Sequence, residues 1–118
     1  MADHLMVAFT ECQPGADEEF NAWYTGTHLP DVLELDGFTA VQRFRQAPAG
    51  NEEGHTYLAI WEIDGDLEEA RRRLASGPPR YRSPAYDRSK SVVLFYTAIT
   101  ERIEQPDGDS SGSLGSGP

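Results

Sequence analysis

Apolar and polar positions along the chain predict four strands and two helical regions. The continuous apolar run 5–9 predicts a short buried strand. Further strands are predicted over 38–45, 55–63 and 91–103. The polar, glycine-containing segment 47–54 is typical of a hairpin loop between the second and third strands.

The segment 17–35 predicts a bent helical region. Asp17 is the expected N-cap, Gly26 is expected to interrupt the helix, and Thr27 to cap a second short part. Three aromatic residues recur at i, i+3 and i+4, which places them on one helical face: Phe20, Trp23 and Tyr24. A second helix is predicted from Asp66, in a variant of the capping box with Glu69, to the breakers that begin at Gly77.

This order, β-α-β-β-α-β, predicts an α+β fold of the ferredoxin-like type with a four-stranded antiparallel sheet. The domain is expected to span residues 1–104. Residues 105–118 are rich in Gly, Ser and Asp and offer one apolar side chain, Leu114. Such a segment buries too little apolar surface to order itself, so a disordered tail is predicted.

Both faces of the predicted sheet carry apolar side chains. In the last strand Val92, Leu94 and Tyr96 point to one side, and Val93 and Phe95 point to the other. Two helices cover only one face, so the second needs another cover, and a second copy of the same sheet is the simplest one. We therefore predict a homodimer closed into an α/β barrel. A monomer with an exposed apolar sheet is the alternative.

Charge and cysteine usage exclude several classes of partner. The net charge of −10 argues against nucleic acid, which needs a basic surface. Seven of the ten basic residues nevertheless lie between Arg71 and Lys90, so a local face could meet an anion. Cys12 is the single cysteine, and neither a leader nor a run long enough to span a membrane is present. A cytoplasmic protein without a membrane partner is expected.

The strongest candidate for chemistry is His28. It follows Tyr24 by one helical turn, at the start of a short helical segment where the positive end of the dipole favours neutral imidazole. Such a histidine in an apolar cavity can act as a general base, or donate a hydrogen bond to a carbonyl oxygen. Tyr24 and Asn21 are candidates to orient His28 or a substrate oxygen. In the alternative interpretation all three residues only pack or cap the helix.

The same segment resembles a known family. The pattern E-F-N-x-W-Y from Glu19, then H-x-P-x-V-L from His28, then G-F-x-x-x-x-R-F from Gly37 is similar to the EthD-like group of the dimeric α/β-barrel superfamily. The stretch 96–99 is also similar to the group's closing strand, and the resemblance covers about residues 4 to 103. It implies an aromatic-lined cavity between helices and sheet, with the histidine matching His28 in its lining.

Several other residues are expected to hold a substrate. Phe20 and Trp23 lie on the aromatic helical face. Tyr57 and Trp61 share one face of the third strand, and whether that face lies under the helices or in the dimer interface is open. The stretch before the last strand is rich in Arg and Tyr and contains Arg80, Tyr81, Arg82, Tyr86 and Arg88. It is interpreted either as a loop that closes over a carboxylate or phenolate of the substrate, or as a solvated loop. Arg43 and Arg45 are expected at the surface or in ion pairs.

No metal-ligand spacing, serine-nucleophile elbow, phosphate loop or dinucleotide fingerprint is present, so neither a metal nor a cofactor is predicted. The leading hypothesis is a cofactor-independent enzyme that acts on a small aromatic or polyketide-like molecule by cyclisation, dehydration, decarboxylation or isomerisation. Two alternatives stay open. One is a cofactor-free monooxygenase or haem-binding protein, and the other is a non-catalytic dimeric ligand-binding protein.

Overall fold

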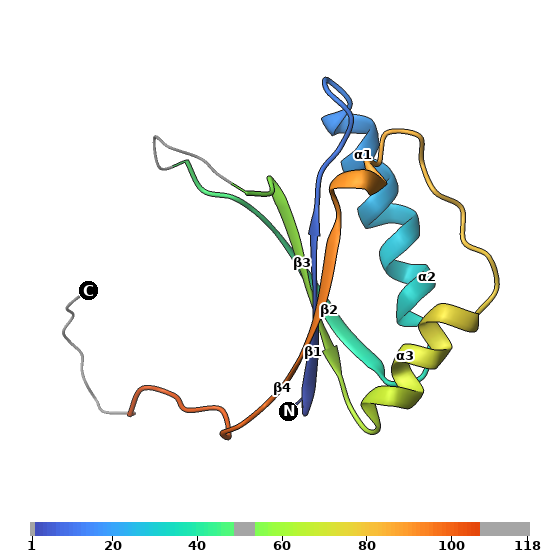
Figure 1. Cartoon of the computed structure of the whole chain (residues 1–118). Coiled ribbons are helices and arrows are strands. Elements are labelled where there is room, and N and C mark those ends of the chain that lie inside the picture. The colour runs from blue at the N-terminus through green and yellow to red at the C-terminus, as the bar shows by residue number, and fades with distance from the viewer. Residues whose placement is uncertain (1, 49–53, 107–118) are drawn as a thin grey trace.

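The computed structural model describes residues 2–48 and 54–106 (Figure 1). Its four strands are β1 (His4–Thr10), β2 (Phe38–Arg45), β3 (Tyr57–Ile63) and β4 (Val92–Thr97). They form one sheet in the order β2-β3-β1-β4, with every neighbouring pair antiparallel. The helices α1 (Asp17–Trp23), α2 (Leu29–Leu33) and α3 (Leu67–Ser76) all lie on one face of this sheet (Figure 1). The predicted β-α-β-β-α-β fold is confirmed.

The first helical region is continuous, and the predicted break at Gly26 is wrong. A π-helical turn, Tyr24–His28, joins α1 to α2. The Leu29 N–H donates to the Tyr24 carbonyl, which is the i to i+5 bond of a π-helix. Because the wider turn satisfies the backbone, Thr27 has no helix end to cap. The region also ends at Leu33, two residues earlier than expected.

The two helix starts differ from each other. Asp66 caps α3 as predicted, with its Oδ1 accepting the Glu69 N–H at 3.0 Å. Asp17 is not the cap of α1, because the cap position belongs to Ala16. The Asp17 carboxylate instead accepts a hydrogen bond from the Tyr57 hydroxyl at 2.6 Å. The Asp17 side chain therefore bonds to a residue on β3 instead of to the first turn of its own helix.

The last strand is shorter than predicted, because it loses its neighbour. Thr97 pairs with His4, the first residue of β1, and the Ala98 N–H makes one further bond to the Asp3 carbonyl. Residues 98–106 then leave the sheet as an extended arm (Figure 1). Ile99 on this arm is 94% exposed. The tail predicted over 105–118 lies outside the described residues from 107 onward, as do residues 49–53 of the predicted hairpin loop.

The two faces of the sheet differ in burial but not in composition. On the face under the helices Met6 pairs with Trp61, and Ala8 with Ala59, and all four are buried. On the opposite face Val7 stands between Ile60 and Leu94, and Leu94 is 41% exposed. The sequence prediction of two apolar faces is thus confirmed, and one of them is open. Within the described residues, no helix is long and apolar enough to cross a membrane.

Candidate functional site

A cavity of about 400 Å³ lies between the helices and the covered face of the sheet. Its floor is formed by Met6 and Ala8 on β1, Trp61 on β3 and Val93 on β4. The rest of the wall comes from the helical region, from the end of α3 and from the irregular segment that follows it. This volume is within the range of pockets that bind small organic molecules.

The π-helical turn brings three rings of this wall together. Trp23 and His28 are five residues apart, yet their rings stack with centroids 5.2 Å apart and an angle of 28° between the planes. Tyr24 meets the same imidazole edge-on, with centroids 4.8 Å apart. In a regular α-helix, residues five apart point in different directions, so the wider turn is what makes the Trp23–His28 contact possible.

His28 is held as a neutral base. Its Nδ1 atom is buried and has no hydrogen-bond partner. Burial, together with the positive charge of Arg80, lowers the pKa of His28 to about 4, although Asp31 opposes the change. The imidazole is therefore unprotonated at neutral pH.

Tyr24 is a hydrogen-bond donor beside His28. Burial raises the pKa of the Tyr24 hydroxyl, so the phenol keeps its proton and can donate it in a hydrogen bond. The Arg43 guanidinium carbon lies 4.5 Å from the centre of the Tyr24 ring. Its Nη1 donates to the Thr25 hydroxyl at 3.1 Å, whereas Nε and Nη2 are buried without partners. Arg43, expected as a surface or ion-pair residue, is thus half-buried, because aromatic rings of the helical region lie against its guanidinium group.

A second polar group lies next to the cavity rather than in its wall. The Asn21 side-chain amide donates to the Tyr57 hydroxyl at 3.2 Å, and this hydroxyl donates to Asp17. The bond from Tyr57 lowers the pKa of Asp17. Tyr57 and Trp61 both lie under the helices, which answers the question of orientation that the sequence left open. Trp61 lines the cavity, whereas Asn21, Tyr57 and the fully buried Phe20 stand behind the lining.

The segment between α3 and β4 forms another part of the cavity wall. Tyr86 lines the cavity and stacks on Phe20, with centroids 5.9 Å apart. Of the arginines in the predicted Arg- and Tyr-rich stretch, Arg80 and Arg82 also line it, whereas Arg88 does not. Arg88 is exposed on a short 3₁₀ turn outside the lining. The sequence pattern thus pointed to the stretch but could not tell which of its arginines reach the cavity.

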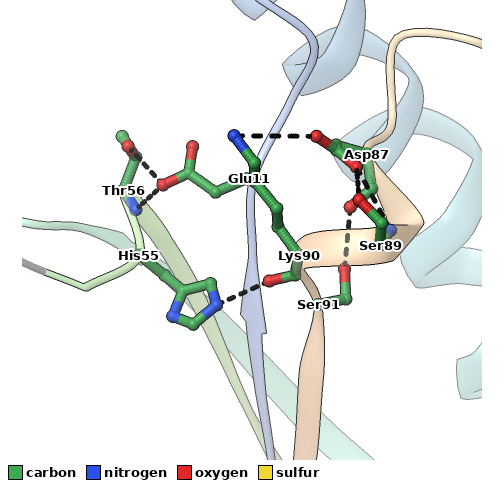
Figure 2. A network of polar contacts seen from close by, with 7 residues as sticks. All are labelled: Glu11, His55, Thr56, Asp87, Ser89, Lys90 and Ser91. Atoms are coloured by element: carbon green, nitrogen blue, oxygen red, sulfur yellow. Dashed lines mark hydrogen bonds and ion pairs between the residues drawn. The ribbon is translucent and has the colours of Figure 1, made fainter.

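A polar network fixes the end of this segment (Figure 2). The Glu11 carboxylate accepts the backbone N–H of Thr56 at 2.7 Å, and the Glu11 carbonyl accepts the N–H of Asp87 at 3.0 Å. The His55 ring bonds the Lys90 carbonyl at 2.6 Å. These contacts join β1, the start of β3 and the residues before β4. They hold Tyr86, the neighbour of Asp87, at a fixed place in the cavity wall.

A larger hollow, of about 610 Å³, lies elsewhere, between the ends of β1 and β4 and residues 98–102 of the arm. Its histidine, His4, is already bonded to the Thr97 hydroxyl at 3.0 Å. Among residues 2–48 and 54–106, no three His, Cys, Asp or Glu side chains gather as metal ligands would. The smaller cavity, with its unpartnered imidazole, is therefore the candidate site.

Three solved structures resemble the chain over most of its length. The haem degrader MhuD from Mycobacterium tuberculosis, solved with two haems bound in its active site, is 20% identical, with a TM-score of 0.58 and coverage of 85% of this chain and 99% of MhuD. An EthD-family protein from Bacillus halodurans is 13% identical, with a TM-score of 0.56 and coverage of 81% and 99%. An Arabidopsis thaliana protein is 14% identical, with a TM-score of 0.58 and coverage of 87% and 94%. The chain shares its four-stranded ferredoxin-like fold with these proteins.

The EthD-family protein among them agrees, at the level of the fold, with the EthD-like resemblance of the segments from Glu19, His28 and Gly37. No protein-family model matches the chain, and no curated protein matches it by sequence. At identities of 13% to 20%, the likeness extends to the fold and not to the reaction.

Proposed function

We propose that the protein is a cofactor-independent enzyme that moves a proton on a small aromatic or polyketide-like molecule bound in the 400 Å³ cavity. One observation carries this proposal: His28 lines an aromatic-lined cavity, and its buried Nδ1 has no hydrogen-bond partner. A buried nitrogen without a partner costs free energy in the folded protein. A substrate proton at this atom would recover it.

The roles of the neighbouring side chains follow from their protonation states. His28, unprotonated, accepts a proton from an acidic C–H or O–H of the substrate. Tyr24, protonated, donates a hydrogen bond to the oxygen on which negative charge develops. Asn21 acts indirectly, because its bond to Tyr57 fixes α1 against β3. The stacked Trp23 ring limits rotation of the imidazole, so the base stays aimed at the substrate.

Proton abstraction can be followed without knowledge of the final product. We would incubate the protein in deuterium oxide with a panel of aromatic ketones and β-dicarbonyl compounds, and follow loss of the acidic C–H by NMR. Wild type should accelerate exchange on at least one compound, and His28→Ala should slow it by about 10²- to 10⁴-fold, the usual contribution of a general base. His4→Ala, at the far end of the sheet, should leave the rate unchanged.

Two results would contradict the proposal. Full exchange activity in His28→Ala would remove His28 from the role of base. Binding of a panel compound with no exchange above background, and with only its affinity changed in His28→Ala, would favour the non-catalytic ligand-binding protein instead.

Haem binding is the second candidate, and the likeness in fold to the haem degrader MhuD favours it. The types of residue in the lining suit the group, because His28 is a neutral imidazole, and Arg80 and Arg82 offer partners for the propionates. A bound haem would supply an iron that reacts with oxygen. Hemin titration tests this candidate: a Soret band that His28→Ala shifts or abolishes would favour it, and an unchanged free-hemin spectrum would exclude it.

We also propose that a second copy of the chain covers the open face of the sheet. Val7, Ile60 and Leu94 adjoin one another there, and Tyr96 beside them is 50% exposed. A contiguous apolar face of this kind marks an interface in most proteins. Two such sheets packed face to face would close a barrel with the helices outside.

A further inference from the structure

The charge of the cavity is opposite to the charge of the protein. The chain carries 20 acidic and 10 basic residues, yet the cavity lining contains no Asp or Glu. It contains two arginines, Arg80 and Arg82, together with the unprotonated His28. In a chain with a net charge of −10, a cavity that is only basic offers a site for an anion.

Neither arginine is neutralised within the part of the chain that the structure describes. The salt bridges found there involve Arg72, Arg73, Lys90 and Arg102 and include neither Arg80 nor Arg82. Arg80 donates one bond, from Nη2 to the Leu74 carbonyl at 3.0 Å, and its remaining N–H groups stay available. No described hydrogen bond uses the Arg82 side chain.

The backbone that carries both arginines is fixed at the cavity. The Trp23 indole N–H donates to the Tyr81 carbonyl at 3.2 Å, so the residue between the two arginines is tied to the aromatic wall. Two residues further on, the Ser83 hydroxyl accepts the Ala85 N–H at 3.1 Å and orders the next turn. The guanidinium groups are therefore carried on a positioned segment beside the ring that stacks on His28.

We propose that the ligand of this cavity is a small aromatic carboxylic acid, whose carboxylate is bound by Arg80 and Arg82 and whose ring lies against Trp23 and Tyr86. This proposal names the substrate class of the proposed function and rests on the same cavity. The volume of about 400 Å³ suits an acid of one or two rings. Guanidinium and carboxylate form short, charge-assisted hydrogen bonds, and two arginines in one cavity lining would select an acid over its neutral analogue.

A pair of probes that differ only in charge tests the proposal. Isothermal titration calorimetry would compare 2-naphthoate with 2-naphthamide on the full-length protein. We expect wild type to bind the acid about 10- to 100-fold more tightly than the amide. Arg82→Gln should reduce this preference, and Arg80→Gln with Arg82→Gln should abolish it while affinity for the amide is retained. Arg88→Gln, exposed and outside the lining, removes the same charge and should behave as wild type.

The single variant Arg82→Gln removes no hydrogen bond of the described structure, so its result does not depend on tolerance of the change at Arg80. Three results would overturn the proposal. Wild type could bind acid and amide with equal affinity, the preference for the acid could survive in the double variant, or neither probe could bind. The two proposals can fail separately. If wild type prefers the acid and the arginine variants lose that preference, while His28→Ala keeps its rate of proton exchange, then the carboxylate site is supported and only the catalytic role of His28 is removed.

Discussion

At the scale of single residues, His28 links the stability of the protein to the state of its site. The imidazole is buried and unprotonated, so its folded pKa of about 4 lies below the value of about 6.5 in an unfolded chain. The unfolded state therefore binds a proton first as the pH falls. The contribution of His28 to stability is fully present above pH 6.5 and is lost as the pH falls toward 4.

This difference predicts an acid-induced loss of stability that depends on one side chain. Between pH 7 and pH 4.5, wild type should lose roughly 2 to 3 kcal/mol more of its free energy of unfolding than His28→Gln, which does not titrate. Urea denaturation at the two pH values measures both losses. His4→Gln is the matched control and should follow wild type. Equal losses in wild type and His28→Gln would mean that the imidazole titrates normally in the folded protein.

The sequence predicted those site residues whose relation is local. Tyr24 and His28 are four apart on a helical segment, so their proximity could be expected from spacing alone. The stacking of Trp23 on His28 could not, since it depends on a π-turn that no local signal marked. Arg43 was misjudged because a polar residue on an edge strand is usually solvated. Its partial burial depends on tertiary contact with Tyr24 and the neighbouring rings.

At the scale of elements, the π-helical turn decides which side chains reach the cavity. Helix signals were clear at Asp66, where the cap is local, and failed at Gly26, where the chain continues without a break. The end of β4 was also missed, because a strand ends where its neighbour ends and that depends on the register with β1. Local patterns thus predicted the elements, and pairing between elements set their bounds.

Two glycines in this part of the chain should respond in opposite ways to the same substitution. Gly26 has no atom within 4 Å of an added Cβ, so Gly26→Ala should stabilise the protein by about 0.5–1 kcal/mol through reduced entropy of the unfolded chain. Gly37 lies in the turn between α2 and β2 with φ +97°, a conformation that alanine adopts only under strain. Gly37→Ala should therefore destabilise by about 1 kcal/mol or more. Thermal denaturation of both variants measures the signs, and destabilisation by Gly26→Ala would show that the turn does not accept a side chain there.

At the scale of the whole molecule, the open apolar face of the sheet is the feature that a single chain leaves unexplained. Its alternation could be predicted from the sequence, because side chains on a strand point to alternate faces. Which face the helices cover could not be predicted, and the buried positions of Tyr57 and Trp61 settle it. The exposed Phe44 and Leu94 then belong to the face for which we propose a second copy.

A charge placed in this face should separate the subunits. We expect wild type to sediment as a dimer at micromolar concentration and Leu94→Lys to sediment as a monomer, because a lysine at that position would have to be desolvated in the interface. Glu68→Gln, on the exposed side of α3, changes the net charge by the same amount and should stay dimeric. A monomeric wild type would contradict the proposed barrel.

The most direct test of the account is the pKa of His28 itself, measured by NMR from the Hε1 chemical shift and assigned by its absence in His28→Gln. We expect the signal to stay at its neutral position down to about pH 5 and to titrate with a midpoint near 4. Such a value would establish a buried, unprotonated base at the cavity wall. A midpoint near 6.5, that of a free histidine, would show an imidazole open to water and would contradict the account.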